Sequence, residues 1–419
     1  MRSVAVIGAG VSGLTAAYVL RDTCAVTLYE ADDRLGGHAH THDVADGPAS
    51  VAVDSGFIVH NDRTYPLLRR LFAELGVPTQ ATEMSMSVRC DGCGLEYAGA
   101  KGPRGLFAGP PTPRYLATLA QVPLFHRRAR RLLDGDGTGY RGGAQVTLGA
   151  FLAAGGYTRH FVRHFVIPLV SAVWSCGPEV VADYPARYLF RFLAHHGMLS
   201  VTGSPTWRTV TGGSRTYVEL LAKQLATVRP ATPVRSLTRT SRGVSVRDDA
   251  DGVRDFDAVV VATHADQALR LLTDPTERER RVLGAFGYSR NDTVLHTDDA
   301  VLPTRAGAHA SWNYRLPGCA PSSGPPLVSY DMNRLQRLQA RGRYLVTLNA
   351  GDRVPADRVI ARMRYDHPVY TPESVAAQDD LPGLNDGRTA FAGAYHGWGF
   401  HEDGCRSGVA AARSLGVAW

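Results

Sequence analysis

The chain has 419 residues, of which 44% are hydrophobic and 20% charged, and its formal net charge is +7. This composition excludes a disordered chain, and the length predicts two intertwined domains rather than one small core. No apolar run reaches the ~18 residues that a membrane span needs. The apolar stretch at the N-terminus is interrupted by glycines where a signal peptide would continue. We therefore expect a cytoplasmic protein.

The first forty residues predict a dinucleotide-binding fold. Residues 3–7 (SVAVI) are typical of a buried parallel strand, the glycine motif 8–13 (GAGVSG) follows at once, and apolar residues at helical spacing come next. A second strand is predicted over 25–29, and Glu30 follows it. In such a fold the glycines allow a tight turn, the approach of a pyrophosphate and close helix packing. The acid binds the ribose hydroxyls.

The next glycines indicate which dinucleotide is bound. Arg34 and the pair Gly36-Gly37 follow Glu30 closely. A second stretch of glycine backbone with a fixed cation suits a longer cofactor, whose pyrophosphate is held from two sides. Glu30 and this RxGG segment together resemble the FAD-binding entry of the flavin-containing amine oxidase superfamily. We therefore expect FAD rather than NAD.

The rest of the chain predicts an α/β protein. We expect a helix over 65–76, a loop over 102–113, mostly helices over 115–200, antiparallel strands over 296–349, a strand over 389–393 and a helix over 402–415. The expected fold class combines a discontinuous Rossmann-like FAD-binding domain with an α+β substrate-binding domain that contains an antiparallel sheet. The first domain would comprise residues 1–75, 205–275 and 385–419, and the second 76–204 and 276–384.

Three features raise the question of further ligands. Cys90-Asp-Gly-Cys93 is a single CxxC motif, and we predict a hairpin turn around Asp91-Gly92, with a redox pair or half of a metal site as alternatives. His38, His40 and His42 would share one face of a strand, but no further ligand cluster is evident, so we expect no metal. The basic run 126–133 (HRRARRLL) predicts a solvated helix face; the alternative is peripheral docking to an anionic membrane or an acyl carrier. No aromatic residues interleave with its arginines, so nucleic acid is not expected.

Several segments together carry a narrower resemblance. They include GGHAHTHD at 36–43, VDSGFIVHNDRTYP at 53–66, WSCGPE at 174–179 and GAYHGWGFHEDGCRSG at 393–408. The chain resembles one subgroup of the superfamily, the NAD/FAD-binding amine-oxidase-like proteins associated with cyclopropane-fatty-acyl-phospholipid synthases. The resemblance implies FAD, the two-domain amine oxidase fold, and a lipid or acyl substrate.

The resemblance and the glycine motif also imply which residues bind the cofactor. The ADP half would be held by Gly8, Ala9, Gly10, Ser12, Gly13, Glu30 and Ala31. The pyrophosphate and flavin would be lined by Arg34, Gly36, Gly37, His38, Gly56, Phe57 and Ile58. Val234 would meet the adenine through its backbone, and Ala262 would flank the diphosphate. The C-terminal contacts would come from Gly393, Ala394, Phe400, His401 and Glu402, where a second helix N-terminus favours negative charge on the flavin.

The catalytic candidates are His401, Trp398 and Tyr395. His401 suits an acid-base or flavin-tuning role near neutral pH, against a structural hydrogen bond. Trp398 and Tyr395 would wall the flavin face, against plain packing, and His60 and His296 are weaker candidates. Tyr395 stands where the superfamily usually has an acid, and no lysine matches the one beside the flavin N5 of amine oxidases.

These residues lead to three functional hypotheses. The first is an FAD-dependent oxidoreductase in which flavin N5 accepts a hydride from a small lipophilic substrate, fatty-acyl or polyketide-like, in an oxidation or desaturation. The second is a redox-neutral FAD-dependent double-bond isomerase. The third is a non-catalytic flavoprotein partner of a lipid methyltransferase.

Overall fold

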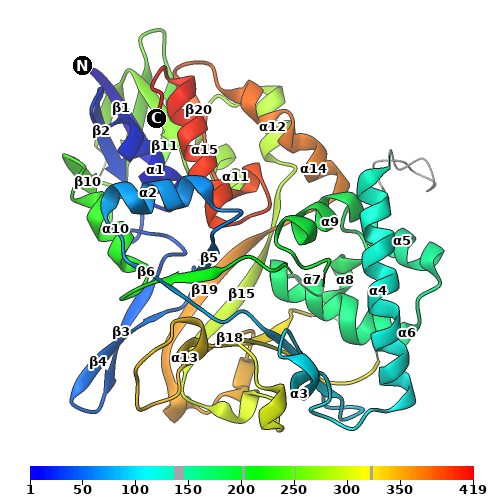
Figure 1. Ribbon diagram of the computed structural model, residues 1–419. Helices are drawn as coiled ribbons and strands as arrows, with labels where there is room; N and C mark the ends of the chain where they lie inside the picture. The colour runs from blue at the N-terminus through cyan, green and yellow to red at the C-terminus, as the bar shows by residue number, and fades with distance from the viewer. Residues whose placement is uncertain (136–145, 201–202, 251, 321–323) are drawn as a thin grey trace.

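The computed structural model describes the chain except for residues 136–145, 201–202, 251 and 321–323 (Figure 1). The chain begins with β1 (Arg2–Ile7), α1 (Val11–Leu20) and β2 (Cys24–Tyr29). β1 and β2 pair in parallel, with Ile7 opposite Tyr29, and most of their side chains are buried. The predicted strand–glycine loop–helix–strand unit is therefore confirmed.

A five-stranded parallel sheet forms around this unit. It adds β10 (Thr227–Arg229), β14 (Ala258–Val261) and β20 (Thr389–Phe391) in the order β10-β2-β1-β14-β20. Its strands come from three distant parts of the chain, so both chain ends lie at this sheet, as Figure 1 shows. The Rossmann-like sheet that the first residues predicted is confirmed.

The last helix packs against the first. α15 (His401–Ser414) begins soon after β20 and lies beside α1 (Figure 1). Gly404 and Gly408 of α15 face Ser12 of α1 at distances that leave no room for larger side chains. The stripe of small residues therefore sets how closely the two ends of the chain approach each other.

Smaller elements surround the parallel sheet. α2 (Pro66–Leu75) ends at Gly76, which adopts a left-handed conformation with φ of 68°. α10 (Arg215–Ala222), α11 (Ala265–Leu271) and α12 (Glu277–Leu283) follow along the chain. The strands β11 (Val234–Arg239), β12 (Val244–Asp248) and β13 (Val253–Phe256) form a three-stranded antiparallel sheet.

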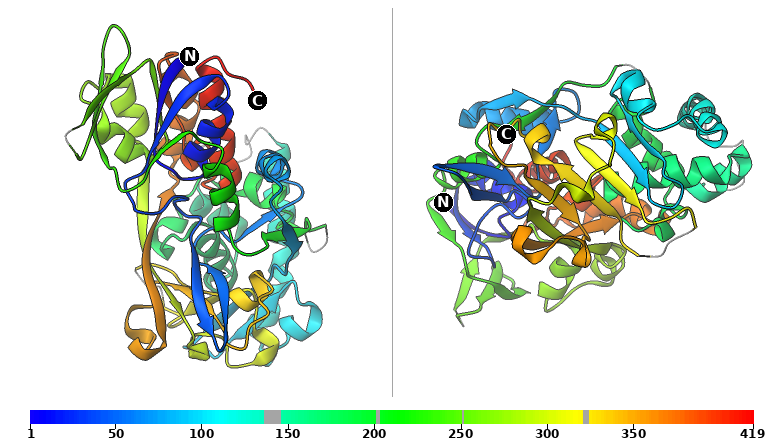
Figure 2. Two further views of the ribbon diagram at one scale, coloured as in Figure 1. Left: turned by 90° about the vertical axis from the view of Figure 1, so that its left-hand side faces the viewer. Right: turned by 90° about the horizontal axis from the view of Figure 1, so that it is seen from below.

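A second large sheet lies below the first in Figure 2. Its order is β19-β15-β18-β17-β16-β7-β8. These strands are β19 (Val359–Val369), β15 (Gly287–His296), β18 (Leu345–Leu348), β17 (Leu327–Asp331), β16 (Trp312–Leu316), β7 (Met86–Cys90) and β8 (Glu96–Gly99). Its pairs are antiparallel as predicted, except that β16 and β7 run parallel. Two short sheets join the regions, β3 (Thr41–Asp46) with β4 (Ala49–Asp54), and β5 (Val59–Asn61) with β9 (Trp207–Val210) and β6 (Thr79–Ala81).

A helical region packs beside the second sheet. It contains α4 (Pro113–Asp134), α5 (Leu148–Gly155), α6 (Arg159–Phe161), a π-helical turn (Val162–Val166), α7 (Ile167–Trp174), α8 (Pro178–Val181) and α9 (Ala186–His195). The predicted loop over 102–113 is wrong in part, because α3 (Gly102–Leu106) occupies its start with a proline in the first turn. In the described ranges, no helix combines the length and apolar character that crossing a membrane requires.

Candidate functional site

The glycine loop between β1 and α1 has two positions, Gly8 and Gly13, where a side chain would clash with the protein. At the third, Gly10, a side chain would not clash. A Cβ at Gly8, whose φ is +99°, would lie 2.8 Å from the carbonyl oxygen of Ala262. A Cβ at Gly13 would lie 1.9 Å from the carbonyl oxygen of Gly8. A Cβ at Gly10 would meet nothing within 4 Å. The space above Gly10 therefore fits a phosphate group at the N-terminus of α1.

Glu30 follows β2 and reaches back to this loop. Its Oε2 accepts a hydrogen bond of 2.7 Å from the Ala9 N–H, and its Oε1 accepts one of 3.0 Å from the Asp32 N–H. The Thr232 N–H donates to the Glu30 carbonyl at 2.8 Å, which brings the chain before Val234 alongside. Ala31 is exposed next to them. These residues surround the place where an adenosine ribose binds in such folds.

The second glycine pair lies directly against the first glycine loop. The Gly36 N–H donates to the Ala9 carbonyl at 2.8 Å, and a Cβ at Gly37 would lie 3.2 Å from the Gly10 Cα. Arg34 donates through Nη1 to the Gly37 carbonyl at 2.8 Å. The structure thus brings two glycine backbones and one cation to the same point, which fits a pyrophosphate held from two sides.

His38 connects this point to Gly56, Phe57 and Ile58. The Phe57 N–H donates to the His38 carbonyl at 2.7 Å, and a Cβ at Gly56 would lie 2.1 Å from the same oxygen. Phe57 and Ile58 are buried. Only glycine at position 56 allows this backbone approach, so the segment is built around His38.

His38 has aromatic neighbours that the sequence did not predict. The rings of Tyr365 and His367 in β19 lie 5.0 and 5.5 Å from its ring, and that of His264 lies 6.4 Å away. Burial, and then the neighbouring imidazoles, lower the pKa of His38 well below its usual value, so the ring is neutral at pH 7. No local pattern signals this cluster, because its members come from three segments far apart in the chain, with Tyr365 and His367 both on β19.

His40 and His42 make hydrogen bonds with nearby hydroxyl groups. His40 Nδ1 lies 3.1 Å from the Tyr365 hydroxyl, and His42 Nε2 lies 2.9 Å from Ser55 Oγ. Their rings lie 4.1 Å apart. These contacts give both imidazoles a structural role beside the segment that carries Gly56.

The C-terminal loop meets the glycine loop through α15. The Gly393 N–H donates to Ser407 Oγ at 2.9 Å, and Ala394 opens a 3₁₀ turn. Phe400 caps α15, with its N–H donating to Asp403 at 3.0 Å. Because α15 packs on α1, the segments 8–13 and 393–404 come together, as predicted.

The His401 side chain contacts two aromatic residues. Its ring stacks on Phe57 with centroids 3.6 Å apart and an interplanar angle of 12°, and its Nε2 lies 3.2 Å from the Tyr217 hydroxyl. Burial lowers the pKa of His401 to about 3. A neutral imidazole offers a hydrogen bond but no acidic proton at pH 7, which favours flavin tuning or positioning over proton transfer.

Glu402 points toward α2. Its Oε1 and Oε2 accept hydrogen bonds of 3.0 Å each from the backbone N–H groups of Leu67 and Leu68. Burial raises the pKa of Glu402 to about 7. The side chain therefore caps α2. Only the backbone of Glu402 could make the predicted contact with the cofactor.

Trp398 and Tyr395 differ in their surroundings. The indole Nε1–H of Trp398 is buried and has no hydrogen-bond partner among the described residues, and its ring lies about 6 Å from those of Tyr188 and Phe192. Tyr395 is 2% exposed and packs against Phe286 in the core behind the parallel sheet. The Tyr395 hydroxyl is also buried without a hydrogen-bond partner among the described residues, so the surroundings separate the two residues. Core side chains enclose Tyr395, whereas Trp398 lies beside α9 with a donor that a ligand would satisfy.

The two weaker histidine candidates lie in packed cores. His60 packs between Tyr65 and Phe72. His296 is fully buried; its Nε2 lies 2.7 Å from Thr347 Oγ1, and its Nδ1 accepts the Asp298 N–H at 3.1 Å. Burial lowers the pKa of His296 from 6.5 to about 4.

We expect His296 to make the fold sensitive to acid. The unfolded chain binds a proton at this imidazole below pH 6.5 and the folded chain does not, so stability falls as the pH drops from 6.5 to 4. His296→Asn keeps an acceptor for Asp298 and removes the titration. It should narrow the difference in unfolding free energy between pH 7 and pH 5 by about 1–2 kcal/mol, measured by urea unfolding. A His296→Asn variant that loses as much stability between pH 7 and pH 5 as the wild type would contradict this assignment.

The sheet, the paired glycine segments and the converging chain ends define a dinucleotide-binding fold of the amine oxidase type. Residues 11–415 match the family described as flavin containing amine oxidoreductase. The chain therefore belongs to this family, and its cofactor is FAD.

Curated and solved proteins are similar to the chain at low identity. Coproporphyrinogen III oxidase of Mycobacterium leprae is 26% identical over 302 residues, covering 65% of this chain and 61% of that protein. The chain thus matches less than two thirds of this relative's length. Cyclohexylamine oxidase from Brevibacterium oxydans superposes with a TM-score of 0.71 at 16% identity, covering 99% of this chain and 98% of the other. A CLA-producing fatty acid isomerase from P. acnes superposes with a TM-score of 0.66 at 16% identity, covering 97% of each chain. The solved structures share the fold.

Proposed function

We propose that the protein oxidises or desaturates a lipophilic substrate, fatty-acyl or polyketide-like, beside the flavin. When bound, FAD supplies a two-electron acceptor at N5. The observation that carries the proposal is an aromatic wall where the helical region meets the C-terminal loop. We define this aromatic wall as Tyr188, Phe192, Trp398 and Phe400.

The aromatic wall is fixed from both sides. Phe192 stacks on Phe400 with ring centroids 4.7 Å apart. The Tyr188 hydroxyl and the Gln378 amide each donate to the Gly397 carbonyl at 2.7 Å, which holds the loop against α9. Phe192 is buried, and Tyr188, Trp398 and Phe400 pack against the same hydrophobic core and are partly buried. Such an apolar boundary beside the flavin would contact a hydrocarbon chain and keep water from the reacting carbon.

The lysines argue against an amine substrate. The sequence contains only Lys101 and Lys223. Lys101 Nζ donates to the His309 carbonyl at 2.7 Å, and Lys223 is exposed at the end of α10. Neither position supplies the flavin-side lysine that the resemblance to amine oxidases would require.

The comparisons support the lipid proposal through the fold only. The fatty acid isomerase and the amine oxidase both superpose over nearly the whole chain, so the scaffold accommodates either substrate class. The association with cyclopropane-fatty-acyl-phospholipid synthases, which the sequence resemblance implies, is part of this proposal. It favours a fatty-acyl chain as the substrate.

The proposal is tested by identifying and then adding the substrate. Mass spectrometry of small molecules that co-purify with the yellow protein should detect acyl or polyketide-like chains. Adding such a chain without oxygen should bleach the flavin absorbance, and adding oxygen should restore it. A shifted double bond without bleaching would instead identify the isomerase, and no response to any chain would support the non-catalytic partner. Coproporphyrinogen III serves as the control substrate, and its turnover in place of a lipid would contradict the proposal.

Trp398→Phe should lower turnover while FAD stays bound. The substitution keeps an aromatic ring in the wall and removes the unpartnered indole N–H. Loss of one buried hydrogen bond to substrate or cofactor costs ~1.5 kcal/mol, or about tenfold in rate. The control is Trp419→Phe, because the indole N–H of Trp419 donates to Glu74 at the protein surface. Equal turnover by Trp398→Phe and Trp419→Phe would show that the Trp398 indole N–H does not bind substrate or cofactor.

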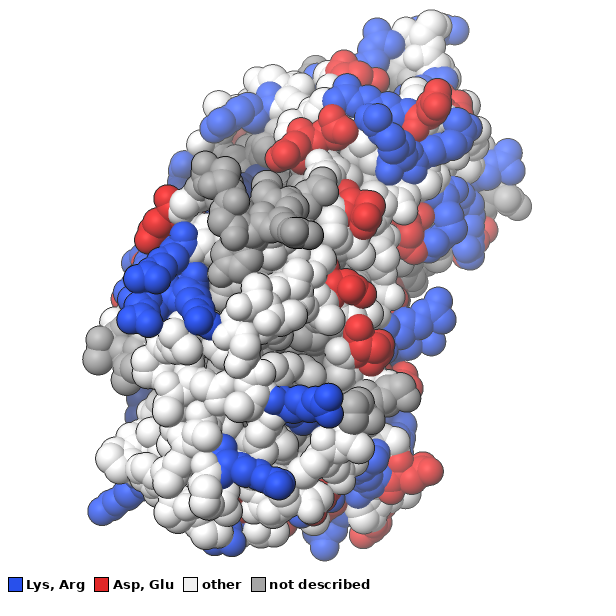
Figure 3. All heavy atoms as spheres, turned by 90° about the vertical axis from the view of Figure 1, so that its right-hand side faces the viewer, with Lys and Arg blue, Asp and Glu red and all other residues white. Residues whose placement is uncertain are grey.

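We also propose that the basic groove on α4 docks an anionic partner. The residues that line it are Pro123, His126, Arg127, Arg130, Arg131, Asp134, Leu199 and Ser200, so three arginines outnumber one acid. On the face of the molecule that carries the helical region, basic side chains border a broad uncharged surface (Figure 3). Binding to anionic vesicles and binding to an acyl carrier protein are measured separately, and the one that occurs identifies the partner. That binding should weaken as salt is added, because salt screens the attraction between opposite charges.

A further inference from the structure

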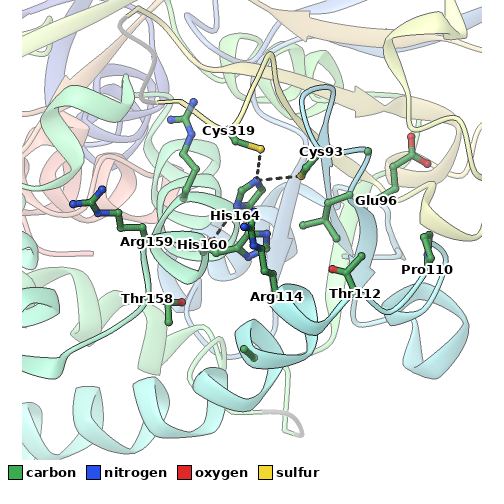
Figure 4. A pocket seen from close by; sticks show the side chains of 15 residues that line it. Cys93, Glu96, Pro110, Thr112, Arg114, Thr158, Arg159, His160, His164 and Cys319 are labelled. Carbon is green, nitrogen blue, oxygen red and sulfur yellow. Dashed lines mark hydrogen bonds between the residues drawn. The ribbon is translucent and has the colours of Figure 1, made fainter.

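Three cysteines and one histidine from distant parts of the chain converge at the end of β7. Figure 4 shows three of the four side chains, those of Cys93, His164 and Cys319. Cys90 ends β7, Cys93 lies in the β7–β8 turn, His164 lies in the π-helical turn and Cys319 follows β16. Their Sγ and Nε2 or Nδ1 ligand atoms all lie within 4.8 Å of one another. The predicted hairpin at the CxxC motif is confirmed, and the fold adds two further metal-binding side chains to it.

Three of the distances between ligand atoms in this cluster agree with the edges of a tetrahedral metal site. Zn–S bonds of ~2.3 Å and Zn–N bonds of ~2.05 Å give tetrahedral edges of about 3.8 Å between sulfurs and about 3.6 Å between sulfur and nitrogen. The Sγ atoms of Cys90 and Cys319 lie 3.6 Å apart. His164 Nε2 lies 3.6 Å from Cys93 Sγ and 3.8 Å from Cys319 Sγ. A disulfide needs sulfurs ~2.0 Å apart and would leave His164 without a role.

His164 is oriented to present its Nε2 to the cysteines. Its Nδ1 lies 3.1 Å from the His160 carbonyl oxygen, so Nδ1 carries the proton and Nε2 is free to bind a cation. The Tyr97 hydroxyl donates to the His164 carbonyl at 2.7 Å. The π-helical turn itself is a local departure that frequently marks functional sites.

The CDGCG sequence builds the turn that carries two of the sulfurs. Gly94 has a left-handed φ of +69°, and its N–H donates to the Cys90 carbonyl at 2.9 Å. A Cβ at Gly92 would lie 3.0 Å from the Cys319 nitrogen. Gly94 therefore allows the left-handed conformation of the turn. Gly92 allows the turn and the loop of Cys319 to lie close together.

We propose that Cys90, Cys93, His164 and Cys319 bind a structural zinc ion. All four positions of the tetrahedron are filled by side chains, which is typical of structural rather than catalytic zinc. Arg163 donates to the carbonyl of Gly318, and its cation lies beside a site in which three thiolates exceed the charge of the ion by one. The ion would tie the helical region to the edge of the seven-stranded sheet. This revises our expectation that the chain binds no metal.

A cavity gives the ion an entry path. It has a volume of about 580 Å³ and is lined by Cys93, His164 and Cys319, with Arg114 and His160 nearby (Figure 4). Cys93 and Cys319 are exposed, whereas Cys90 and His164 are buried. Loading the intact protein with zinc from solution is therefore feasible.

The experiment measures metal in the purified FAD-loaded protein by mass spectrometry of the elements. The wild type should hold about one zinc per chain, and Cys93 and Cys319 should resist alkylation until a chelator is added. The affinity of His164→Ala for zinc should be at least about tenfold lower than that of the wild type. His160→Ala, one helical turn away, should keep it, because the backbone carbonyl that orients His164 remains. His164→Cys should restore binding as a four-cysteine site.

Two further readouts keep the test independent of folding. The flavin absorbance of each variant reports whether the FAD-binding region is intact, and Co²⁺ bound in place of zinc should give the strong visible absorption of a tetrahedral thiolate site. Cys24→Ser provides a cysteine control outside the cluster. Wild-type protein from zinc-supplemented cells that holds no stoichiometric zinc, or that contains a Cys90–Cys319 disulfide, would overturn the proposal.

Discussion

The Gly10→Ala variant will fold and yet purify with little or no flavin. A methyl group at this position meets no protein atom within 4 Å, so the native packing is undisturbed. It occupies the space through which a pyrophosphate reaches the N-terminus of α1. Losing one or two charge-assisted hydrogen bonds, each of ~1.5–3 kcal/mol, weakens FAD binding by about 10- to 20,000-fold. FAD titration of the stripped protein, with circular dichroism as the check on folding, measures the effect.

Two other glycines separate cofactor binding from folding. Gly287→Ala adds a methyl group that also meets nothing within 4 Å, at the start of β15, and should bind FAD normally. Gly13→Ala places a Cβ 1.9 Å from the Gly8 carbonyl oxygen and should reduce the folded yield itself. If Gly10→Ala kept wild-type affinity for FAD, the glycine loop would not be the pyrophosphate site.

The second large effect is expected for Gly408→Ala in α15. Alanine normally stabilises a helix by ~1 kcal/mol relative to glycine. Here its Cβ would lie 2.3 Å from the Ser12 carbonyl oxygen and 3.1 Å from the Ala16 nitrogen. Overpacking of this kind costs about 1–3 kcal/mol or more, so we expect a lower melting temperature and, because α1 shifts, weaker FAD binding.

The control for this prediction lies on the opposite face of the same helix. Ala410 is exposed, and Ala410→Leu should change neither the melting temperature nor FAD affinity appreciably. A Gly408→Ala variant as stable as the wild type would show that α1 and α15 do not pack as closely as the structure has them. The dependence of the cofactor site on both chain ends would then lose its physical basis.

Local sequence signals predicted the strand, glycine loop, helix and second strand at the start of the chain. The glycines between β1 and α1, Glu30 and the RxGG pair each have a conformational or electrostatic requirement that is visible in a few neighbouring residues. The closeness of the C-terminal loop to this region followed from the family resemblance, and the structure places α15 on α1 accordingly.

Sites assembled from distant segments were not predictable in this way. The imidazoles around His38 come from residues 264 and 367, and the cysteine cluster needs His164 and Cys319 beside the CxxC motif. Their spacing in the chain carries no information, because sheet pairing and the π-helical turn bring them together. Likewise Glu402 and Tyr395, assigned to the site from their position in a motif, direct their side chains to α2 and to a core.

Hydrogen exchange of the flavin-stripped protein with and without added FAD tests the central claim most directly. If both chain ends enclose the cofactor, FAD should slow exchange together in residues 8–13, 36–38 and 393–402. Protection confined to the N-terminal segments, or a chain that stays colourless and unprotected in excess FAD, would contradict it.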